Sequence, residues 1–340
     1  MILDLFRGKA VTIPPMDGAL RPNTVLEEAR VLLSVEAPDN LVAVKGDVLF
    51  SSGNDIRRLA DNTVVASYNQ SVTALAAHGD GRFAAGLETG VIAFGGKNLD
   101  GFNCPVALAF AGDDLYVCNG SEANAAGAWA SDLMHKNARG SVWRVNIGTG
   151  ERTCLAGNLA FPYGVAIDVA NSRLIVSESW RHRIIGIPLD GGAPTELLAK
   201  LPGYPARISA SPMGFVLSLF APRNRLIEFV LTEDDYRKAM IGEIDSRYWI
   251  APSLAPARSF LEPLQNGGVR SMGIHKPWSP SRSCGLVVEL DFQLQPAASY
   301  HSRANGRRHG VTSAIAHDDA IIVASKGGDA ILSVSRETAP

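Results

Sequence analysis

The hydrophobic positions along the chain recur as a repeated phrase, in which two short apolar strands flank a tight polar turn. Six copies of the phrase lie at residues 41–52, 74–86, 106–117, 164–176, 208–218 and 311–323. Each copy predicts a β-hairpin, because its connection is rich in Gly, Asp and Asn, which adopt tight-turn geometry.

The spacing of the copies predicts the architecture. Most copies are followed by a further strand, at 56–59, 141–146, 183–188 or 330–335. Three or four short strands repeated at about 35–60 residues are typical of propeller blades. Small residues in the innermost strands suit the crowded axis of such a ring. We therefore expect an all-β fold, a six-bladed β-propeller that forms one domain over residues 1–340.

Two segments interrupt the repeat. Residues 119–139 fall inside the third blade and are expected to cap one mouth of the central channel. Residues 232–282 fall between the fifth and sixth copies, and the strand pattern resumes at 285. Their first part is charged and predicts a helix with Thr232 as its N-cap. A long loop of this kind is either a functional lid or variable decoration.

Composition and charge restrict the classes of partner that we expect this protein to bind. Of the 340 residues 46% are hydrophobic, enough for a large core without disulfides. The formal net charge is −2 and only 19% of residues are charged, so we expect no nucleic-acid partner. The four cysteines include no CxxC pair and predict neither a disulfide framework nor a metal framework. The sequence holds neither a signal-peptide core nor a membrane span, so we expect a cytoplasmic protein with no membrane partner.

Several segments together resemble a known superfamily. They are residues 14–23, 140–146, 161–168, 176–184, 201–205 and 310–313. In this order they are similar to strictosidine-synthase-like proteins, and the resemblance covers nearly the whole chain. The wider superfamily includes gluconolactonases and paraoxonases. The resemblance implies a six-bladed propeller and, in many members, a calcium ion in the central channel.

The chain departs from the family pattern at the expected calcium ligands. Tyr163 stands where calcium-binding members have Asn, and Ala206 stands where they have Asp. Asp39 is the acidic ligand that remains as a candidate for metal binding. Calcium needs about six to eight oxygen ligands, so we expect no calcium at the usual site and no other cofactor. Calcium binding through substitute oxygens, such as those of Asn40 or Asn119, stays an open alternative.

A second departure concerns the synthase reaction. The resemblance places the catalytic Glu of the plant synthase at the start of the sixth inner strand, where this chain has Thr312. A threonine hydroxyl cannot hold and return a proton near neutral pH as a carboxyl can. We therefore expect no Pictet–Spengler activity.

Ligands of propellers bind near the channel mouth, where strand starts from several blades converge. Asp39 and Asn40 lie at such a start and either contact a ligand or cap the strand. Tyr163 and Arg207 are expected at equivalent positions of their blades. They either present a phenol and a guanidinium to an anionic or carbonyl-bearing ligand, or Arg207 pairs with Asp39 and closes the channel.

Five further residues are candidates. Glu178 lies beside Trp180 and either works as an acid/base with a raised pKa or anchors a neighbouring arginine. His309 precedes the sixth inner strand and is either an acid/base or a solvated loop residue. His135 and His275 lie in the two interrupting segments, within reach of the mouth.

Two functions remain. The first is a lactonase- or esterase-type hydrolase of a small molecule, with Asp39, Tyr163, Glu178, Arg207 and His309 as catalytic candidates. Donors such as the arginine or the tyrosine would stabilise the oxyanion, while an acidic residue or the histidine would activate water. The second is a non-catalytic propeller that binds a small molecule or a protein and has lost its metal site. A closed Asp39–Arg207 ion pair favours the second function and an open polar pocket favours the first.

Overall fold

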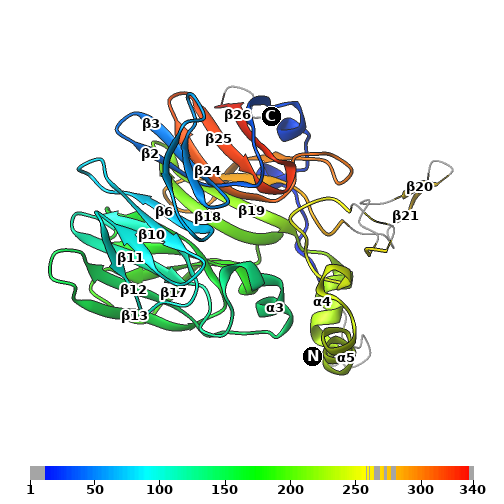
Figure 1. Cartoon of the computed structure of the whole chain (residues 1–340). Coiled ribbons are helices and arrows are strands. Elements are labelled where there is room, and N and C mark those ends of the chain that lie inside the picture. The colour runs from blue at the N-terminus through cyan, green and yellow to red at the C-terminus, as the bar shows by residue number, and fades with distance from the viewer. Residues whose placement is uncertain are drawn as a thin grey trace.

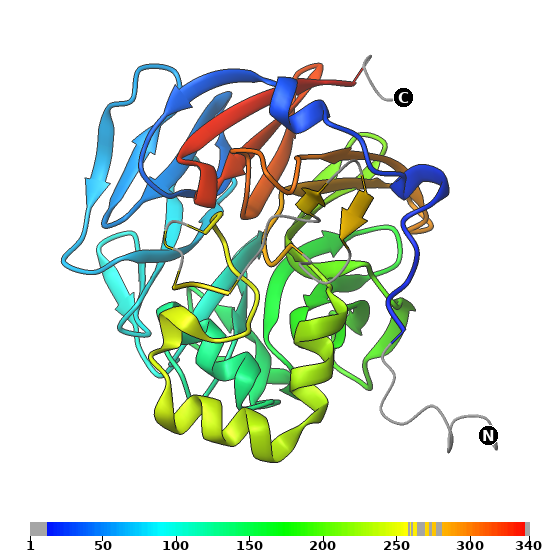
Figure 2. The same ribbon diagram turned by 90° about the vertical axis from the view of Figure 1, so that its right-hand side faces the viewer.

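Six sheets form the body of the molecule. The structure is a computed structural model and describes residues 12–257, 259, 261–263, 269–271, 274–276 and 281–336, with the backbone alone at 269–271 and 274–276. In this part of the chain, six four-stranded antiparallel sheets are arranged around a common centre (Figure 2). The predicted six-bladed β-propeller is confirmed.

The first three blades each use four consecutive strands, with the first strand innermost. Blade 1 comprises β2 (Pro38–Val44), β3 (Asp47–Ser52), β4 (Asp55–Arg58) and β5 (Val64–Ser67). Blade 2 comprises β6 (Val72–Ala77), β7 (Phe83–Leu87), β8 (Ile92–Phe94) and β9 (Lys97–Leu99). Blade 3 comprises β10 (Pro105–Ala111), β11 (Asp114–Asn119), β12 (Gly140–Asn146) and β13 (Arg152–Leu159).

The last three blades follow the same order, except that the sixth is completed from the other end of the chain. Blade 4 comprises β14 (Pro162–Asp168), β15 (Arg173–Glu178), β16 (Arg183–Pro188) and β17 (Thr195–Leu198). Blade 5 comprises β18 (Gly203–Ser211), β19 (Gly214–Pro222), β22 (Leu286–Leu290) and β23 (Pro296–His301). Blade 6 comprises β24 (Val311–His317), β25 (Ala320–Ser325), β26 (Ala330–Ser335) and β1 (Arg30–Ser34).

Local sequence explains the hairpins. In blade 1, Val44 pairs with Asp47 across a two-residue turn. Both turn residues, Lys45 and Gly46, have positive φ angles, of 48° and 88°. Two such residues in succession form the tight turn whose twist matches that of the flanking strands. The Gly- and Asp-rich connections noted in the sequence thus set the register of the hairpin.

The ring is closed by β1. This strand pairs antiparallel with β26, so that Arg30 lies opposite Ser333 and Ser34 opposite Ala330. It is preceded by η1 (Gly18–Leu20) and α2 (Val25–Glu28). Blade 6 therefore contains strands from both ends of the described chain, with β1 as its outermost strand.

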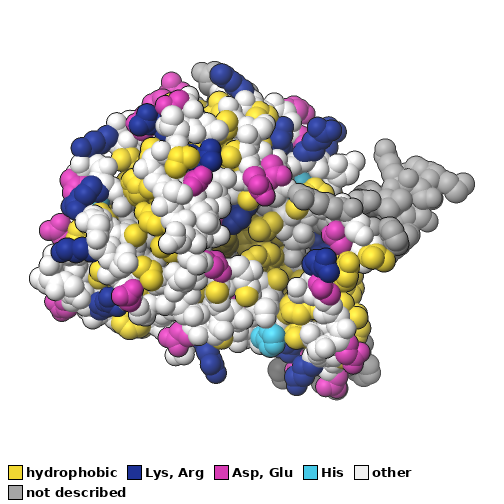
Figure 3. All heavy atoms as spheres, viewed as in Figure 1, with side chains coloured by type: hydrophobic (Ala, Val, Ile, Leu, Met, Phe, Trp, Pro, Cys, Tyr) yellow, Lys and Arg dark blue, Asp and Glu magenta, His cyan; other side chains and the backbone are white. Residues whose placement is uncertain are grey.

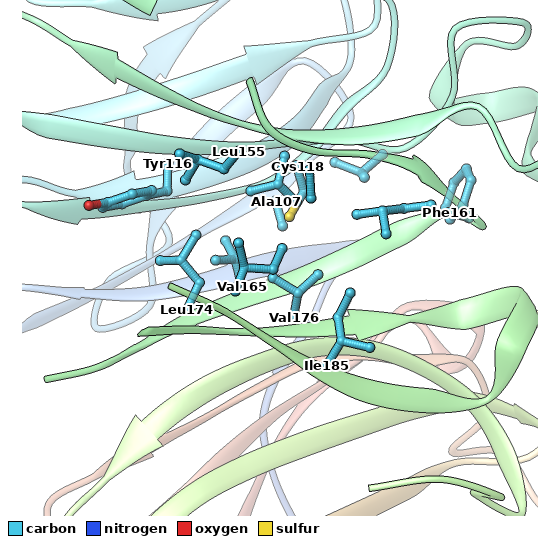
Figure 4. Packing of buried hydrophobic residues seen from close by; sticks show 14 of the residues in the cluster. Ala107, Tyr116, Cys118, Leu155, Phe161, Val165, Leu174, Val176 and Ile185 are labelled. Atoms are coloured by element: carbon cyan, nitrogen blue, oxygen red, sulfur yellow. The ribbon is translucent and has the colours of Figure 1, made fainter. Parts of the chain in front are cut away.

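Most of the core lies between neighbouring blades. In the cluster between blades 3 and 4, Cys118 packs against Val165 and Val176 (Figure 4), and Val142 belongs to the same cluster. Cys118, Val142 and Val176 have no exposed surface. At about 25 cal/mol per Å² of buried apolar surface, these interfaces supply much of the driving force for closing the ring.

The two interrupting segments add helices at one end of the ring axis (Figures 1 and 2). The first lies in blade 3, as predicted, and contains η2 (Ala126–Ala128) and α3 (Trp129–Met134). The second lies between β19 and β22, within blade 5 and not between blades. Its elements are α4 (Arg225–Thr232), α5 (Asp234–Glu243), η4 (Ser246–Tyr248), β20 (Val269–Ser271) and β21 (Ile274–Lys276).

The predicted start of the charged helix at Thr232 is wrong. Thr232 is the last residue of α4, whose N-cap is Asn224, and its hydroxyl donates to the Phe229 carbonyl at 2.8 Å. The Asn224 side chain accepts the Ile227 N–H at 2.8 Å, which satisfies a free donor of the first turn. The charged stretch forms α5, which Glu233 precedes.

The face of the molecule seen in Figure 3 is mixed in charge. Lys and Arg side chains alternate with Asp and Glu side chains over the side of the molecule seen in Figure 3. The helices of the described residues are all too short or too polar to span a bilayer.

Candidate functional site

Every inner strand carries a β-bulge near its start. The register shifts lie after Asp39, Val72, Pro105, Pro162, Pro205 and Val311. A bulge adds one residue to a strand and turns its backbone groups away from the ladder. The six equivalent bulge residues are Asn40, Thr73, Val106, Tyr163, Ala206 and Thr312. They surround the axis at one level.

The bulges correct the expectation that Tyr163 and Arg207 occupy equivalent positions of their blades. In blade 4 the register shifts between Pro162 and Gly164, so Tyr163 is the extra residue of that bulge. In blade 5 the register shifts after Pro205, so Ala206 is the bulge residue that corresponds to Tyr163. Arg207 is one residue further along and corresponds to Gly164. Tyr163 and Arg207 are therefore not at equivalent positions, although the structure does bring them together.

The guanidinium of Arg207 lies at the centre of this level. Its Nη1 donates to Asp39 Oδ1 at 2.6 Å and lies 3.4 Å from the Thr312 carbonyl oxygen. Its Nη2 donates to the carbonyls of Thr73 at 2.7 Å and Val106 at 3.1 Å. The three carbonyls belong to bulge residues of blades 2, 3 and 6. Because a bulge turns these carbonyls out of the strand ladder, their oxygens are free to point at the axis.

Tyr163 supplies the contact from the remaining blade. The guanidinium carbon of Arg207 lies 5.0 Å from the centroid of the Tyr163 ring, within the range of a cation–π contact. Burial raises the pKa of the Tyr163 phenol, which stays neutral at physiological pH. Since Arg207 belongs to blade 5, this one guanidinium and its partners join all six blades.

Asp39 is the anionic centre of the cluster. Besides Arg207 it accepts the Thr312 hydroxyl at 2.8 Å and the Lys326 ammonium at 2.9 Å. The N–H of Asn40 donates to the same carboxylate at 2.8 Å. Burial raises the pKa of Asp39, but the charges of Arg207 and Lys326, with the hydrogen bonds, outweigh burial and hold it at about 2.

Lys326 was missed by the sequence analysis. It follows β25 in η5 (Lys326–Gly328), and 287 positions separate it from Asp39. The Asp39 charge raises the pKa of the Lys326 ammonium against the opposing effect of burial. Its side chain is 32% exposed. The only sequence signal is its place directly after the inner hairpin of blade 6.

The residues on the axis do not fit calcium. Three carbonyls and one carboxylate that would face such an ion already accept hydrogen bonds from Arg207. The single carboxylate carries one negative charge, and two cationic side chains lie within 3 Å of it. Asn40 Oδ1 is buried and accepts no hydrogen bond from the described residues, but one neutral oxygen does not complete a calcium site.

The described residues offer no other metal site. They contain no group of three or more His, Cys, Asp or Glu side chains placed to hold a metal ion. The alternative ligand Asn119 is occupied, because its Oδ1 accepts the N–H groups of Asn103 and Cys104 at 3.1 Å and 2.7 Å.

Glu178 and Trp180 lie away from the axial cluster. Glu178 is fully buried and is paired with Arg181 at 2.5 Å and Arg183 at 2.6 Å. It also accepts the Ala160 N–H at 2.7 Å. This is the arginine-anchoring arrangement that the sequence left open as an alternative to acid/base chemistry. Trp180 contacts none of the axial side chains through a hydrogen bond; its Nε1 is bonded elsewhere.

The histidines are also separate from the axis. His309 is fully buried, with Nδ1 2.7 Å from Ser283 Oγ and Nε2 2.8 Å from the Arg303 carbonyl oxygen. Burial lowers its pKa. His135 is exposed, with Nδ1 2.8 Å from the Ser131 carbonyl oxygen. The backbone of His275 lies in β21, while its side chain falls outside the described part of the structure.

Beyond the cluster, a channel runs along the axis. A cavity of about 360 Å³ is lined by inner-strand residues of all six blades, and Arg207 is among them. The lining is mostly small and apolar, with Ala43, Ala76, Ala107, Ala109, Ala166 and Ala314. The other lining residues lie further along the strands than the bulges do, so the charged cluster closes one end of an apolar channel.

Comparison with known proteins gives the fold and not the activity. No protein-family model matches the sequence, and no curated protein matches it. The X-ray structure of a "putative gluconolactonase" is similar over 90% of this chain and 91% of that chain, with a TM-score of 0.54 and 11% sequence identity. A chain from a nidogen/laminin complex matches over 57% of this chain and 78% of its own length, with a TM-score of 0.45 and 15% identity. The expected likeness to gluconolactonase-like propellers thus holds at the level of the fold.

Proposed function

We propose that this protein is a small-molecule-binding propeller in which an arginine replaces a metal ion at the axis. One observation carries the proposal. The Arg207 guanidinium takes up a carboxylate and three backbone carbonyls from four different blades. Those oxygens are the groups that a bound cation would need. The closed Asp39–Arg207 pair is also the arrangement that favours binding over catalysis at this position.

An arginine suits this role chemically. Guanidinium is charged at any physiological pH and presents five N–H donors in a fixed plane, so one side chain can serve several acceptors at once. Asp39, with a pKa of about 2, is fully ionised near neutral pH and is a weak proton acceptor there. It is therefore better matched to holding the two cations than to activating water.

A metal-free hydrolase is the second candidate, of the lactonase or esterase type. It is favoured by Lys326, whose ammonium lies beside Asp39 and whose side chain is 32% exposed. A fixed ammonium can stabilise the oxyanion that forms when water attacks a lactone carbonyl. The fold likeness to a "putative gluconolactonase" supports the choice of lactones as test substrates.

Two measurements test these functions, and the first asks whether Arg207 has replaced a metal ion. Metal content of the purified protein is determined together with thermal unfolding in calcium or in a chelator. We expect no bound metal and no calcium-dependent shift of the melting temperature. A shift that is present in the wild type and lost in Asp39→Ala would overturn the proposal.

Hydrolysis is measured on the same preparations. Five- and six-membered lactones and aryl esters are followed with a pH indicator, in the wild type, in Lys326→Met and in Lys238→Met, which changes an exposed lysine of α5. We expect no turnover above background. Turnover that is lost in Lys326→Met and kept in Lys238→Met would establish the hydrolase in place of the binding protein.

A further inference from the structure

A second cavity lies outside the axial cluster, between the two insertions. Its volume is about 410 Å³, within the range of small-molecule sites. Its walls come from α3 of the blade 3 insertion, α4 of the blade 5 insertion and η3 (Ser179–Arg181), which follows the second strand of blade 4. Figures 1 and 2 show α3 and α4 at the same end of the ring.

One part of the wall is apolar and held in place. The apolar lining residues are Leu133, Ala138, Ala160, Trp180 and Leu231. The Trp180 ring stacks on Phe161 with centroids 4.5 Å apart. Its Nε1 donates to Asp132 Oδ1 at 2.8 Å. A fixed aromatic wall binds a flat apolar molecule without first losing side-chain freedom.

The helices around the cavity are fastened to each other. Arg237 of α5 is buried and donates to the Met134 carbonyl at the end of α3. The same arginine pairs with Asp234 at 2.7 Å. Because α4 and α5 are consecutive, this contact ties both helices of the blade 5 insertion to the blade 3 insertion. The cavity is thus bounded by elements whose relative positions are set by buried contacts.

Two cations lie among the lining residues. The side chains of Lys136 and Arg181 are 50% and 42% exposed. Lys136 is 3.5 Å from Asp234, a carboxylate that Arg237 already holds more closely. Arg181 uses Nη1 for Glu178 and the Asn158 carbonyl, while no described residue engages its Nη2 and Nε.

The acidic groups near the cavity are already satisfied. Glu228 also lines it and accepts Arg223 at 2.9 Å and the Tyr204 hydroxyl at 3.2 Å, with His182 Nε2 at 3.3 Å. Burial raises the pKa of Glu228, but His182 and Arg223 outweigh burial and hold it at about 2. The Glu228 carboxylate is therefore already occupied and does not compete with a ligand for Lys136 and Arg181.

We propose that this cavity binds a small organic anion with a flat apolar body. The carboxylate of the ligand lies between Lys136 and Arg181, and its body packs against Trp180 and Leu231. The assignment rests on the proposed function as a small-molecule-binding protein and names the ligand class. The assignment does not depend on Arg207. A negative result in the metal measurements would therefore leave it standing, and a negative result in the binding measurements would leave the axial proposal standing.

The test is calorimetric titration with benzoate, 2-naphthoate and indole-3-acetate, and with the uncharged 2-naphthamide as the matched neutral ligand. We expect at least one of the acids to bind, and 2-naphthoate to bind at least tenfold more tightly than the amide. Lys136→Met should weaken binding of the acids about tenfold and leave the amide unaffected.

Two tryptophan substitutions on α4 locate the site. Leu231→Trp fills the cavity and should abolish binding, whereas Phe229→Trp changes a residue that is 46% exposed on the same helix and does not line the cavity. Thermal unfolding of both variants verifies that they fold. Absence of binding by all three acids at millimolar concentration, equal affinity for acid and amide, or unchanged binding by folded Leu231→Trp would each overturn the proposal.

Discussion

Replacing Arg207 by methionine removes the charge at the axis and keeps an unbranched side chain of similar length. The Arg207 side chain is only 12% exposed, and that of Asp39 is 5% exposed. The variant leaves the Thr73 and Val106 carbonyls without the donor that now serves them. Lys326 still pairs with Asp39, so that carboxylate is not left alone.

The expected cost follows from burial. Breaking a buried ion pair by removing one partner costs about 3–5 kcal/mol, because the other charge stays buried. Since Lys326 compensates Asp39 in part, the lower figure applies to that pair. The carbonyls that lose their donor add to it, at roughly 1 kcal/mol or more for each. We therefore expect Arg207→Met to lose about 5 kcal/mol and to melt on the order of 10 °C lower.

Urea unfolding followed by circular dichroism measures this loss. The matched control is Arg57→Met, because Arg57 pairs with Asp55 at 2.8 Å but both side chains are about one-quarter exposed, at 27% and 26%. This pair is more exposed than the axial one, and solvent-exposed pairs contribute about 0.2–1 kcal/mol. If Arg207→Met were no less stable than Arg57→Met, the guanidinium would not be holding the blades together and the reasoning from its contacts would be wrong.

Two further predictions concern the same region. The pKa of Asp39 falls from 3.8 to about 2 on folding, so its carboxylate stabilises the fold above about pH 4 and loses that effect as the pH falls toward 2. Between pH 5 and pH 2 the wild type should lose about 2 kcal/mol more than Asp39→Asn in urea unfolding. Gly164→Ala should lose about 1–3 kcal/mol, because its Cβ would lie 2.5 Å from the Ala206 carbonyl oxygen of the next blade.

Each of these has a result that would contradict it. Parallel pH profiles for the wild type and Asp39→Asn would mean that the carboxylate gains nothing from its partners. For the glycine, Gly157→Ala is the control, since its Cβ would meet no atom within 4 Å and its φ angle is not positive. Equal stabilities of the two alanine variants would show that blades 4 and 5 are not in close contact at Gly164.

The sequence predicts the blades well because their information is local. An apolar strand, a turn such as Lys45–Gly46 and a second strand specify a hairpin within about a dozen residues. The helix in the second insertion was misplaced because the prediction used local sequence alone. Thr232 is a suitable N-cap in isolation, but Asn224 caps an earlier helix that packs on the core through Ile227 and Val230.

The axial cluster was predicted only in part. Asp39 and Arg207 were singled out as one alternative, since the family pattern has a metal at this level. Lys326 was not, because nothing within its own segment relates it to a carboxylate 287 positions away. The alignment of Tyr163 with Arg207 failed because both strands carry a bulge, and the hydrophobic pattern does not mark which residue of each strand is the bulged one.

The reach of Arg207 along the chain also bears on the order of folding. Its partners Asp39, Thr73, Val106 and Thr312 lie between 101 and 168 positions away. Contacts of such separation form after the local hairpins, because the chain between them must first be organised. Interactions that are absent from the transition state slow unfolding and leave the folding rate unchanged. We therefore expect the Arg207 contacts to slow unfolding of the completed ring more than they change its rate of folding.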